Sequence, residues 1–336
     1  MKICICGGGG LGHTCAGVLS AHESVTVNLL TGHPKAWNHE FRVNLPDENS
    51  LTGKVDVISN DPREAIEECD IILFCLPSYL VEETILKLRD YLTGNQIIGT
   101  VVSNSGFFIF CHRHLPQTTP LFGFQRVPYV SRVVRYGQEA NLLGYRPELL
   151  MAVENIENKE AFKTRIEELF KEKVSLVNNF YEVTLSNSNP ILHTGRLYTM
   201  WHNWDGQPFT CQSFFYREWT NEASELEIKM DKEFFELLNA LKINTEHIET
   251  LLEHYESIDA VSMTRKIQSI ESFSTILSPM KEVEGGWLPD FGSRYFTEDF
   301  PYGLRMIHDL AHEHHVNVPH IDKVYNWGVD VISKYQ

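Results

Sequence analysis

The sequence has little positive charge and no long apolar run, and each shortage argues against a class of protein. No stretch approaches the roughly 18 apolar residues that a membrane-spanning helix needs, and the dense run IILFCL at 71–76 has only the length of a strand. Lys and Arg total 29 against 45 Asp and Glu, which gives a net charge of −16. Proteins that bind nucleic acid usually present a basic face. We therefore expect neither a membrane nor a nucleic acid as partner.

Glycine and proline are not in excess in this sequence, and the number of cysteines is odd. With 21 Gly and 14 Pro in 336 residues, a collagen-like or low-complexity chain is excluded. The seven cysteines are an odd number, and those in apolar, strand-like segments are expected to be buried reduced thiols: Cys4, Cys6, Cys69 and Cys75. The opening residues MKICICGGGG lack the apolar segment and cleavage site of a signal peptide. Together these features predict a cytoplasmic protein.

The first half of the chain alternates apolar runs of strand length with helical stretches. This strand–helix–strand rhythm predicts an α/β domain of the Rossmann type, with a doubly wound parallel sheet and right-handed crossovers. The expected strands are 2–6, 25–30, 54–59, 71–76, 97–102, 149–154 and 174–177.

After about residue 182 the β-branched runs disappear and helical periodicity takes over. Helices are expected within 184–203, 214–241, 259–275 and 302–315. A chain of 336 residues has room for two domains. We therefore predict a Rossmann domain over 1–181 and an all-α domain over 182–336.

A glycine-rich loop follows the first strand. Gly7, Gly9 and Gly12 form G-x-G-x-x-G between a strand and a helix, and Gly10 and Leu11 complete the loop. In this context the first glycine permits a tight turn, the second lets a pyrophosphate approach the backbone, and the third allows close helix–strand packing. The N-terminus of the helix then offers N–H groups to the anion. The loop predicts a dinucleotide site.

The end of the second strand lacks the acid typical of NAD sites. Thr31, His33 and Lys35 stand where an Asp or Glu usually binds the ribose hydroxyls. Without a carboxylate, a ribose 2′-phosphate would be attracted by His33 or Lys35, so the pattern favours NADP over NAD. The alternative interpretation of Lys35 is an ordinary solvated loop lysine.

Two segments of the helical half are unusual and suggest catalytic groups. In 187–193, NSNPILH, polar residues and a proline mark a helix start and place His193 in the first turn. The segment 294–303, RYFTEDFPYG, is expected to be a polar, aromatic loop. An Asp beside a His fixes the ring tautomer and makes a usable general acid and base.

Five histidines lie close together in the sequence near the C-terminus, but their pattern argues against a metal site. His308, His312, His314, His315 and His320 fall within 13 residues, and the first two are spaced i, i+4. The run is not H-E-x-x-H, and no cysteine lies nearby. We interpret it as a solvated helix end, where the helix dipole favours His, and expect no metal.

Four motifs carry a family resemblance. GGGGLG, FQRVPYVSR at 124–132, NSNPILH and RYFTEDFPYGL at 294–304 resemble the octopine/nopaline (opine) dehydrogenase family, and the likeness continues to PHIDKVYNW at 319–327. The resemblance implies a Rossmann domain followed by a helical domain like that of 6-phosphogluconate dehydrogenase. It implies an enzyme that joins an amino acid to a 2-oxo acid and reduces the imine with NAD(P)H. One departure is Gly10, where many members have Asn.

The resemblance also implies roles for individual residues. The family's catalytic His maps onto His193, its partner Asp onto Asp299 and its substrate-binding Arg onto Arg294. Gln125 and Arg126, on the loop FGFQRVPYVSR, are candidates for the nicotinamide side or for the carboxylate of the oxo acid. Ordinary salt bridging is the alternative interpretation of Arg126. A homodimer is compatible with these expectations.

Two further functions stay open at this stage. One is a two-domain reductase acting on a 2- or 3-hydroxy or oxo acid without an amine. The other is a non-catalytic protein that senses NADP(H). The presence of His193, Arg294 and Asp299 together argues against a sensor, because a sensor does not need them.

Overall fold

The computed structural model describes residues 1–335 and divides the chain into two compact units. The first unit is Met1–Ser186 and the second starts at Asn187, so the division falls later than the predicted boundary at 181/182. The helix α6 (Tyr181–Thr184) belongs to the first unit because Val183 is buried in its core. Within residues 1–335, none of the helices is both long and apolar enough to span a membrane.

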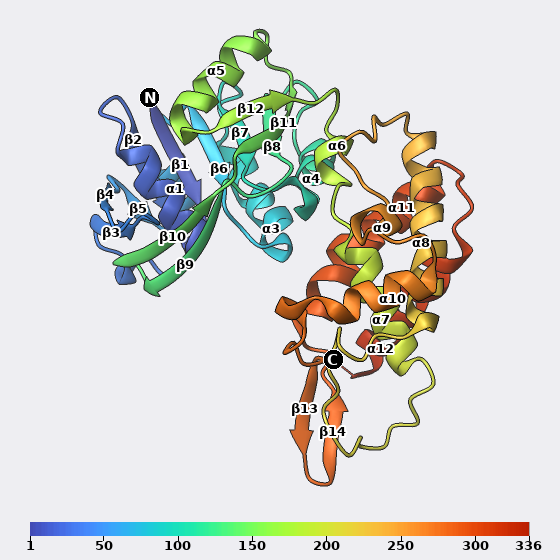
Figure 1. Cartoon of the computed structure of the whole chain (residues 1–336). Coiled ribbons are helices and arrows are strands. Elements are labelled where there is room, and N and C mark those ends of the chain that lie inside the picture. Colours follow the sequence, from blue (N-terminus) through green and yellow to red (C-terminus); the bar gives the residue numbers. More distant parts are fainter. Residues whose placement is uncertain (336) are drawn as a thin grey trace. The chain divides into compact units, whose positions relative to one another are not determined.

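The first unit is built on an eight-stranded, mostly parallel sheet (Figure 1), as the strand–helix rhythm predicts. One pairing departs from the parallel pattern, because β8 and β11 run antiparallel. In spatial order the strands are β12 (Lys173–Leu176), β11 (Glu148–Glu154), β8 (Leu121–Phe124), β7 (Ile97–Thr100), β6 (Ile71–Phe74), β1 (Lys2–Cys6), β2 (Thr26–Leu30) and β5 (Ile58–Ser59).

Helices cover both faces of this sheet. Because side chains alternate along a strand, Ile3 and Ile5 enter one core with α1 (Gly10–Ser20) and α5 (Lys159–Phe170). Cys4 and Cys6 enter the other core, with α2 (Pro62–Ile66), α3 (Ser78–Leu88) and α4 (Phe107–His114). The four cysteines expected to be buried thiols are indeed buried and free. Short 3₁₀ turns are η1 (Pro34–Ala36), η2 (Arg89–Tyr91) and η3 (Ser103–Ser105).

A second, four-stranded sheet packs against α1 and was not predicted. Its strands are β4 (Ser50–Lys54), β3 (Glu40–Asn44), β10 (Glu139–Tyr145) and β9 (Tyr129–Arg135). The strand expected over 54–59 is therefore wrong. The chain at Lys54 still pairs with β3, and only Ile58 and Ser59 join the large sheet.

The second unit is mainly helical, and the predicted helices are present with shorter bounds. They are α7 (Asn189–Trp201), α8 (Asn221–Ala240), α9 (Leu251–His254), α10 (Ala260–Ser269), η4 (Glu271–Phe273), α11 (Arg305–Glu313) and α12 (Pro319–Tyr335).

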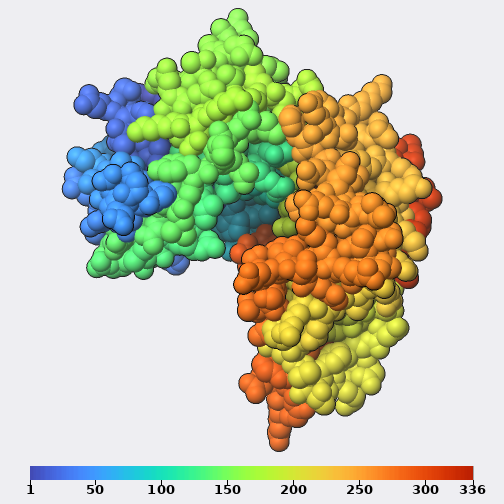
Figure 2. Space-filling model, in the orientation of Figure 1, coloured from blue at the N-terminus to red at the C-terminus, as the bar shows by residue number. Residues whose placement is uncertain are grey.

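Two elements of this unit correct the expectation of an all-α domain with loops. Strands β13 (Met280–Val283) and β14 (Gly286–Pro289) form a hairpin that projects from the unit (Figure 2). It turns at Gly285 and Gly286, whose φ angles of 92° and 143° suit glycine. The segment expected to be a polar loop is instead a π-helix, η5 (Tyr295–Leu304), which leads directly into α11.

The glycine loop gives a prediction that separates folding from binding. A Cβ at Gly12 would lie 1.9 Å from the carbonyl oxygen of Gly7, whereas a Cβ at Gly9 has no atom within 4 Å. We expect Gly12→Ala to lower the free energy of unfolding by about 1–3 kcal/mol, the usual cost of overpacking. Gly9→Val should unfold like the wild type and yet lose dinucleotide binding.

Thermal unfolding followed by circular dichroism, with NADH and NADPH titrated by fluorescence, measures both effects. Wild-type stability of Gly12→Ala, or wild-type titration by Gly9→Val, would contradict the assigned geometry.

Candidate active site

The glycine loop is shaped by its own backbone. The N–H of Gly7 donates to the carbonyl of Leu30 at 2.9 Å, and Gly7 has a φ of 121°, which suits glycine alone. Helix α1 begins at Gly10. Its N-cap residue, Gly9, has no side chain that could accept a hydrogen bond from the first N–H groups of the helix. The first N–H groups of α1 therefore lack intrahelical partners and can meet an anion.

A buried histidine, which sequence analysis did not single out, fixes this loop from beneath. The Nδ1 of His13 lies 2.8 Å from the carbonyl oxygen of Gly9, and its Nε2 lies 2.8 Å from the N–H of Gly137. The ring therefore donates from Nδ1, accepts at Nε2 and is neutral. Burial lowers the pKa of His13, and its ring stacks on Trp37 at 4.0 Å between centroids. The turn between β9 and β10 is thereby tied to the glycine loop.

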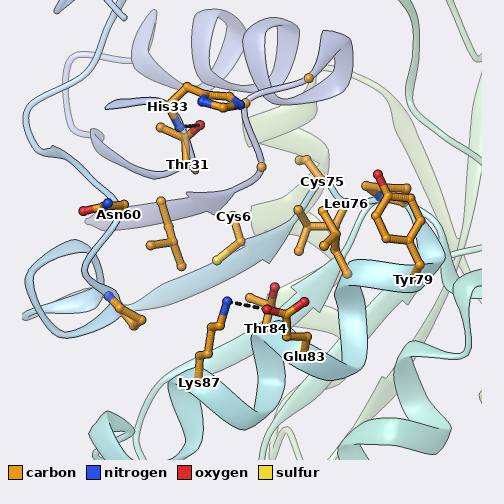
Figure 3. Close-up of a pocket in the computed structure, with 18 of the residues that line it drawn as sticks. Cys6, Thr31, His33, Asn60, Cys75, Leu76, Tyr79, Glu83, Thr84 and Lys87 are labelled. Carbon is orange, nitrogen blue, oxygen red and sulfur yellow. Dashed lines mark hydrogen bonds and ion pairs between the residues drawn. The ribbon is translucent and has the colours of Figure 1, made fainter. Parts of the chain in front are cut away.

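A cavity of about 560 Å³ opens at the carboxyl ends of β1, β2 and β6 (Figure 3). The chain moves from β1 to β2 on one side and to β6 on the other, so this is the switch point where doubly wound sheets bind nucleotides. Gly7–Gly9 form part of the lining, together with Cys75–Pro77 after β6, which lies beside Gly7. The cavity and the open space at Gly9 suit a dinucleotide.

The predicted cofactor residues divide between this cavity and its surroundings. Thr31 and His33 line the cavity, whereas Lys35 is exposed on η1 and does not. Gly10 opens α1, where a Cβ would lie 3.2 Å from the carbonyl oxygen of Ser131. Leu11 packs against the apolar core.

Sequence analysis missed other residues of the lining, among them Tyr136, Asn60 and Lys87. Tyr136 places its hydroxyl 3.1 Å from Oγ1 of Thr31. Asn60 lies on the loop that follows β5. Lys87 contributes a positive charge to the lining, and its Nζ forms an ion pair with Glu83 at 2.5 Å (Figure 3). Tyr136 and Asn60 come from segments without a recognisable nucleotide motif, so no local signal identifies them.

In the second unit, the structure brings the predicted pair together. Nδ1 of His193, in α7, lies 2.8 Å from Oδ2 of Asp299, in η5. Both side chains are largely buried, with exposed fractions of 13% and 20%. An ionised carboxylate can only accept a hydrogen bond, so Nδ1 carries the proton of the neutral ring. Nε2 is then unprotonated and can accept a hydrogen bond.

The other ring nitrogen has a partner that was not predicted. Nε2 of His193 lies 2.9 Å from the hydroxyl of Tyr216, which donates to it in the neutral ring. Nε2 of His193 is therefore already hydrogen-bonded in this structure. Burial raises the pKa of Tyr216, so its hydroxyl keeps its proton at neutral pH. Asp299, His193 and Tyr216 form a continuous hydrogen-bonded chain, which we call the His193 relay.

Aromatic rings enclose the relay. Tyr295 and Phe215 contact the imidazole edge-on at 4.9 and 5.8 Å between centroids. Burial, and then the charge of Asp299, raise the pKa of Tyr295. These rings limit access of water and hold the imidazole in one orientation.

Arg196, also missed from sequence, fixes the segment that carries Tyr216. Its guanidinium donates to the carbonyls of Phe215 at 3.1 Å and Glu218 at 2.7 Å. Burial lowers the pKa of Arg196 to about 10, against the opposing charge of Glu227. Arg196 stays charged at neutral pH and anchors the backbone on both sides of Tyr216.

The predicted substrate residues are distributed over both units. Arg294 is exposed and precedes η5, the element that carries Asp299. Among residues 1–335 its guanidinium has no hydrogen bond or ion pair, so its charge is available. Arg126 belongs to the first unit, where Nη2 donates to the carbonyl of Ser186 at 3.0 Å. Burial, with the nearby charge of Arg146, lowers its pKa. Gln125 beside it is partly buried.

Two family models match the two halves of the chain. Residues 176–332 match the octopine/nopaline dehydrogenase alpha-helical domain, described as NAD/NADP. Residues 3–103 match ketopantoate reductase PanE/ApbA. The site pair lies in the first of these matches and the glycine loop in the second.

Relatives extend the likeness over the whole chain. Octopine dehydrogenase of Mizuhopecten yessoensis is 26% identical over 99% of this chain and 90% of its own length. Tauropine dehydrogenase of Arabella iricolor is 21% identical over 98% and 91%.

Solved structures support the fold. An octopine dehydrogenase with NADH and L-arginine has a TM-score of 0.87 at 24% identity, covering 99% of this chain and 90% of that one. Yersinopine dehydrogenase with NADP⁺ has a TM-score of 0.74 at 11% identity, covering 99% and 91%. The glycine loop, the helical unit and these full-length matches agree: the chain is an NAD(P)-dependent dehydrogenase of the opine dehydrogenase type, and its helical unit matches the octopine/nopaline dehydrogenase family model.

Proposed function

We propose that His193 is the acid–base group of this opine dehydrogenase, which joins an amino acid to a 2-oxo acid and reduces the product. The observation that carries the proposal is the His193 relay. A carboxylate at Nδ1 fixes the tautomer and stabilises the imidazolium. The hydroxyl at Nε2 adds a second group able to pass a proton.

The chemistry needs a proton at one oxygen atom. The amine adds to the carbonyl carbon of the oxo acid, and the resulting carbinolamine loses water to give an imine. His193 first takes a proton at Nε2 from the ammonium group of the amino acid, which frees the amine to add, and then donates that proton from Nε2 to the departing oxygen, directly or through the hydroxyl of Tyr216. Asp299 holds the imidazolium meanwhile. A nicotinamide dinucleotide bound at the glycine loop supplies the hydride that reduces the imine.

Arg294 is proposed to hold a substrate carboxylate. Both reactants carry one, and a guanidinium can bind it through two parallel hydrogen bonds. Its free charge and its place five residues before Asp299 support this role. Gln125 and Arg126 are proposed as further contacts for the nicotinamide side or the oxo acid.

The substrates are proposed by comparison with relatives. Octopine dehydrogenase structures are described with L-arginine and with pyruvate, and another relative is a tauropine dehydrogenase. We propose a small 2-oxo acid such as pyruvate for this chain, with an amine-bearing acid as second substrate.

A preference for NADP is proposed from the nucleotide cavity. No carboxylate follows β2, and His33 lines the cavity there. Lys35 lies outside the cavity lining, so His33 is the better candidate to contact a 2′-phosphate.

The reaction itself gives the first prediction for this function. Oxidation of NAD(P)H, followed by absorbance across a matrix of amino acids and 2-oxo acids, should require both substrates. An amine must be present before an imine can form. Equal turnover with the oxo acid alone would instead indicate a hydroxy-acid reductase, the class suggested by the match over residues 3–103.

The relay gives the second prediction. His193→Ala should lower kcat by roughly 10²–10⁴-fold, the usual range for a lost general acid–base, with little change in cofactor affinity. Asp299→Asn should also lower kcat, because the amide no longer stabilises the imidazolium. Tyr216→Phe should lower kcat less if the imidazole can reach the substrate directly. His202→Gln, at the other end of α7, is the matched control. Wild-type kcat for His193→Ala would refute the assignment.

The cavity gives a third prediction, on cofactor choice. A carboxylate introduced at residue 33 would repel a 2′-phosphate and bind ribose hydroxyls. His33→Glu should therefore raise the KM for NADPH more than that for NADH. Lys35→Glu should act in the same direction but more weakly, since Lys35 lies outside the cavity lining. Steady-state kinetics with both cofactors measure this, and a wild-type preference for NADH would show the proposal to be wrong.

A further inference from the structure

Three side chains that can bind a metal meet on the surface of the second unit, and none of them belongs to the His193 relay. His308 and His312 lie one turn apart on α11, and Asp322 lies on α12. Their ligand atoms all lie within 4.8 Å of one another. The i, i+4 spacing noted in the sequence is thus completed by a carboxylate from a neighbouring helix.

The two imidazoles converge on one carboxylate oxygen. Nε2 of His312 lies 2.8 Å from Oδ1 of Asp322, and Nε2 of His308 lies 3.5 Å from the same atom. Ligands of a tetrahedral zinc ion, bound at 2.0–2.2 Å, stand about 3.4 Å apart. The separation between His308 and Asp322 is already close to this value, and the separation between His312 and Asp322 would have to widen by about 0.6 Å.

The surroundings of His308 prepare it as a ligand. Its Nδ1 donates to Oδ1 of Asp309 at 2.9 Å, which leaves the lone pair of Nε2 pointing toward Asp322. Arg305 holds the other oxygen of Asp309 at 3.4 Å, and the ring packs on Tyr325 at 4.2 Å between centroids. A carboxylate on the far nitrogen is the usual support of a metal-binding histidine.

We propose that His308, His312 and Asp322 bind one divalent transition-metal ion of the zinc class. Two imidazoles and a carboxylate are donors typical of Zn²⁺, Cu²⁺ and Ni²⁺, whereas Ca²⁺ and Mg²⁺ prefer oxygen alone. His312 is exposed, with 55% of its side chain accessible, so the ion is reached from solvent and keeps an open position for water. On binding, the proton on Nε2 of His312 passes to solvent or to Nδ1.

The ion would connect α11 to α12. Helix α11 continues directly from η5, which carries Asp299. A bond across the two helices stabilises the folded state by mass action, because the unfolded chain does not hold the three groups together. Metal binding is therefore expected to raise the midpoint of thermal unfolding without any contact to the relay.

The test is zinc binding to the whole chain prepared without a polyhistidine tag and freed of metal with a chelator. Competition with a chromophoric chelator should show one Zn²⁺ bound per chain, and the unfolding midpoint should rise with zinc. His312→Gln and Asp322→Asn should each weaken binding by at least ~10-fold and remove the shift in midpoint. His314→Gln, an exposed histidine at the end of the same helix outside the cluster, should bind like the wild type.

Copper supplies an independent readout. The Cu²⁺ form should show an electron paramagnetic resonance spectrum with two nitrogen ligands, and His308→Gln should reduce it to one. Circular dichroism verifies that the variants fold, and Asp322→Asn keeps the size of the side chain. Absence of zinc binding in the wild type would overturn the proposal. Wild-type affinity in both His312→Gln and Asp322→Asn would do the same, because the ion would then lie elsewhere.

Discussion

The hydrogen bond between Asp299 and His193 joins the two segments that carry the proposed acid–base pair. Helix α7 supplies the imidazole and η5 supplies the carboxylate, and they approach closely at a second point, where a Cβ at Gly303 would lie 2.6 Å from Cγ of Pro190. Pro190 fixes the start of α7 and Gly303 makes room for it. The packing of these backbones thus sets the distance between the imidazole and the carboxylate.

The His193 relay also depends on groups outside its own hydrogen-bonded chain. Arg196 fixes the carbonyls on both sides of Tyr216, and Tyr216 is packed between the rings of Trp219 and Phe273. A buried cation is costly unless it is well hydrogen-bonded, so its two backbone acceptors are part of its stability. The orientation of one tyrosine hydroxyl is therefore determined by a buried charge on the same helix as His193.

Sequence patterns predicted those features that depend on residues close together in the chain. The glycine loop was found because Gly7, Gly9 and Gly12 act within one turn, and the sheet because strands and helices alternate. The contact between His193 and Asp299 spans 106 positions, and only the family resemblance connected them. Tyr216 has no periodic signal, and the second sheet was missed because β3 pairs with β10, about a hundred residues away. The π-helix was missed because Pro301 lies inside it, and a proline in the interior usually breaks a helix.

The hydrogen bond between Gly137 and His13 makes the glycine loop depend on a segment far along the chain. The match to the ketopantoate reductase model ends at residue 103, yet the group that donates to Nε2 of His13 lies beyond it, in the turn between β9 and β10. A chimaera joined near residue 103 would leave a buried imidazole nitrogen without a donor and the floor of the glycine loop without support. An exchange of the glycine loop between two such proteins would therefore have to include the second sheet as well.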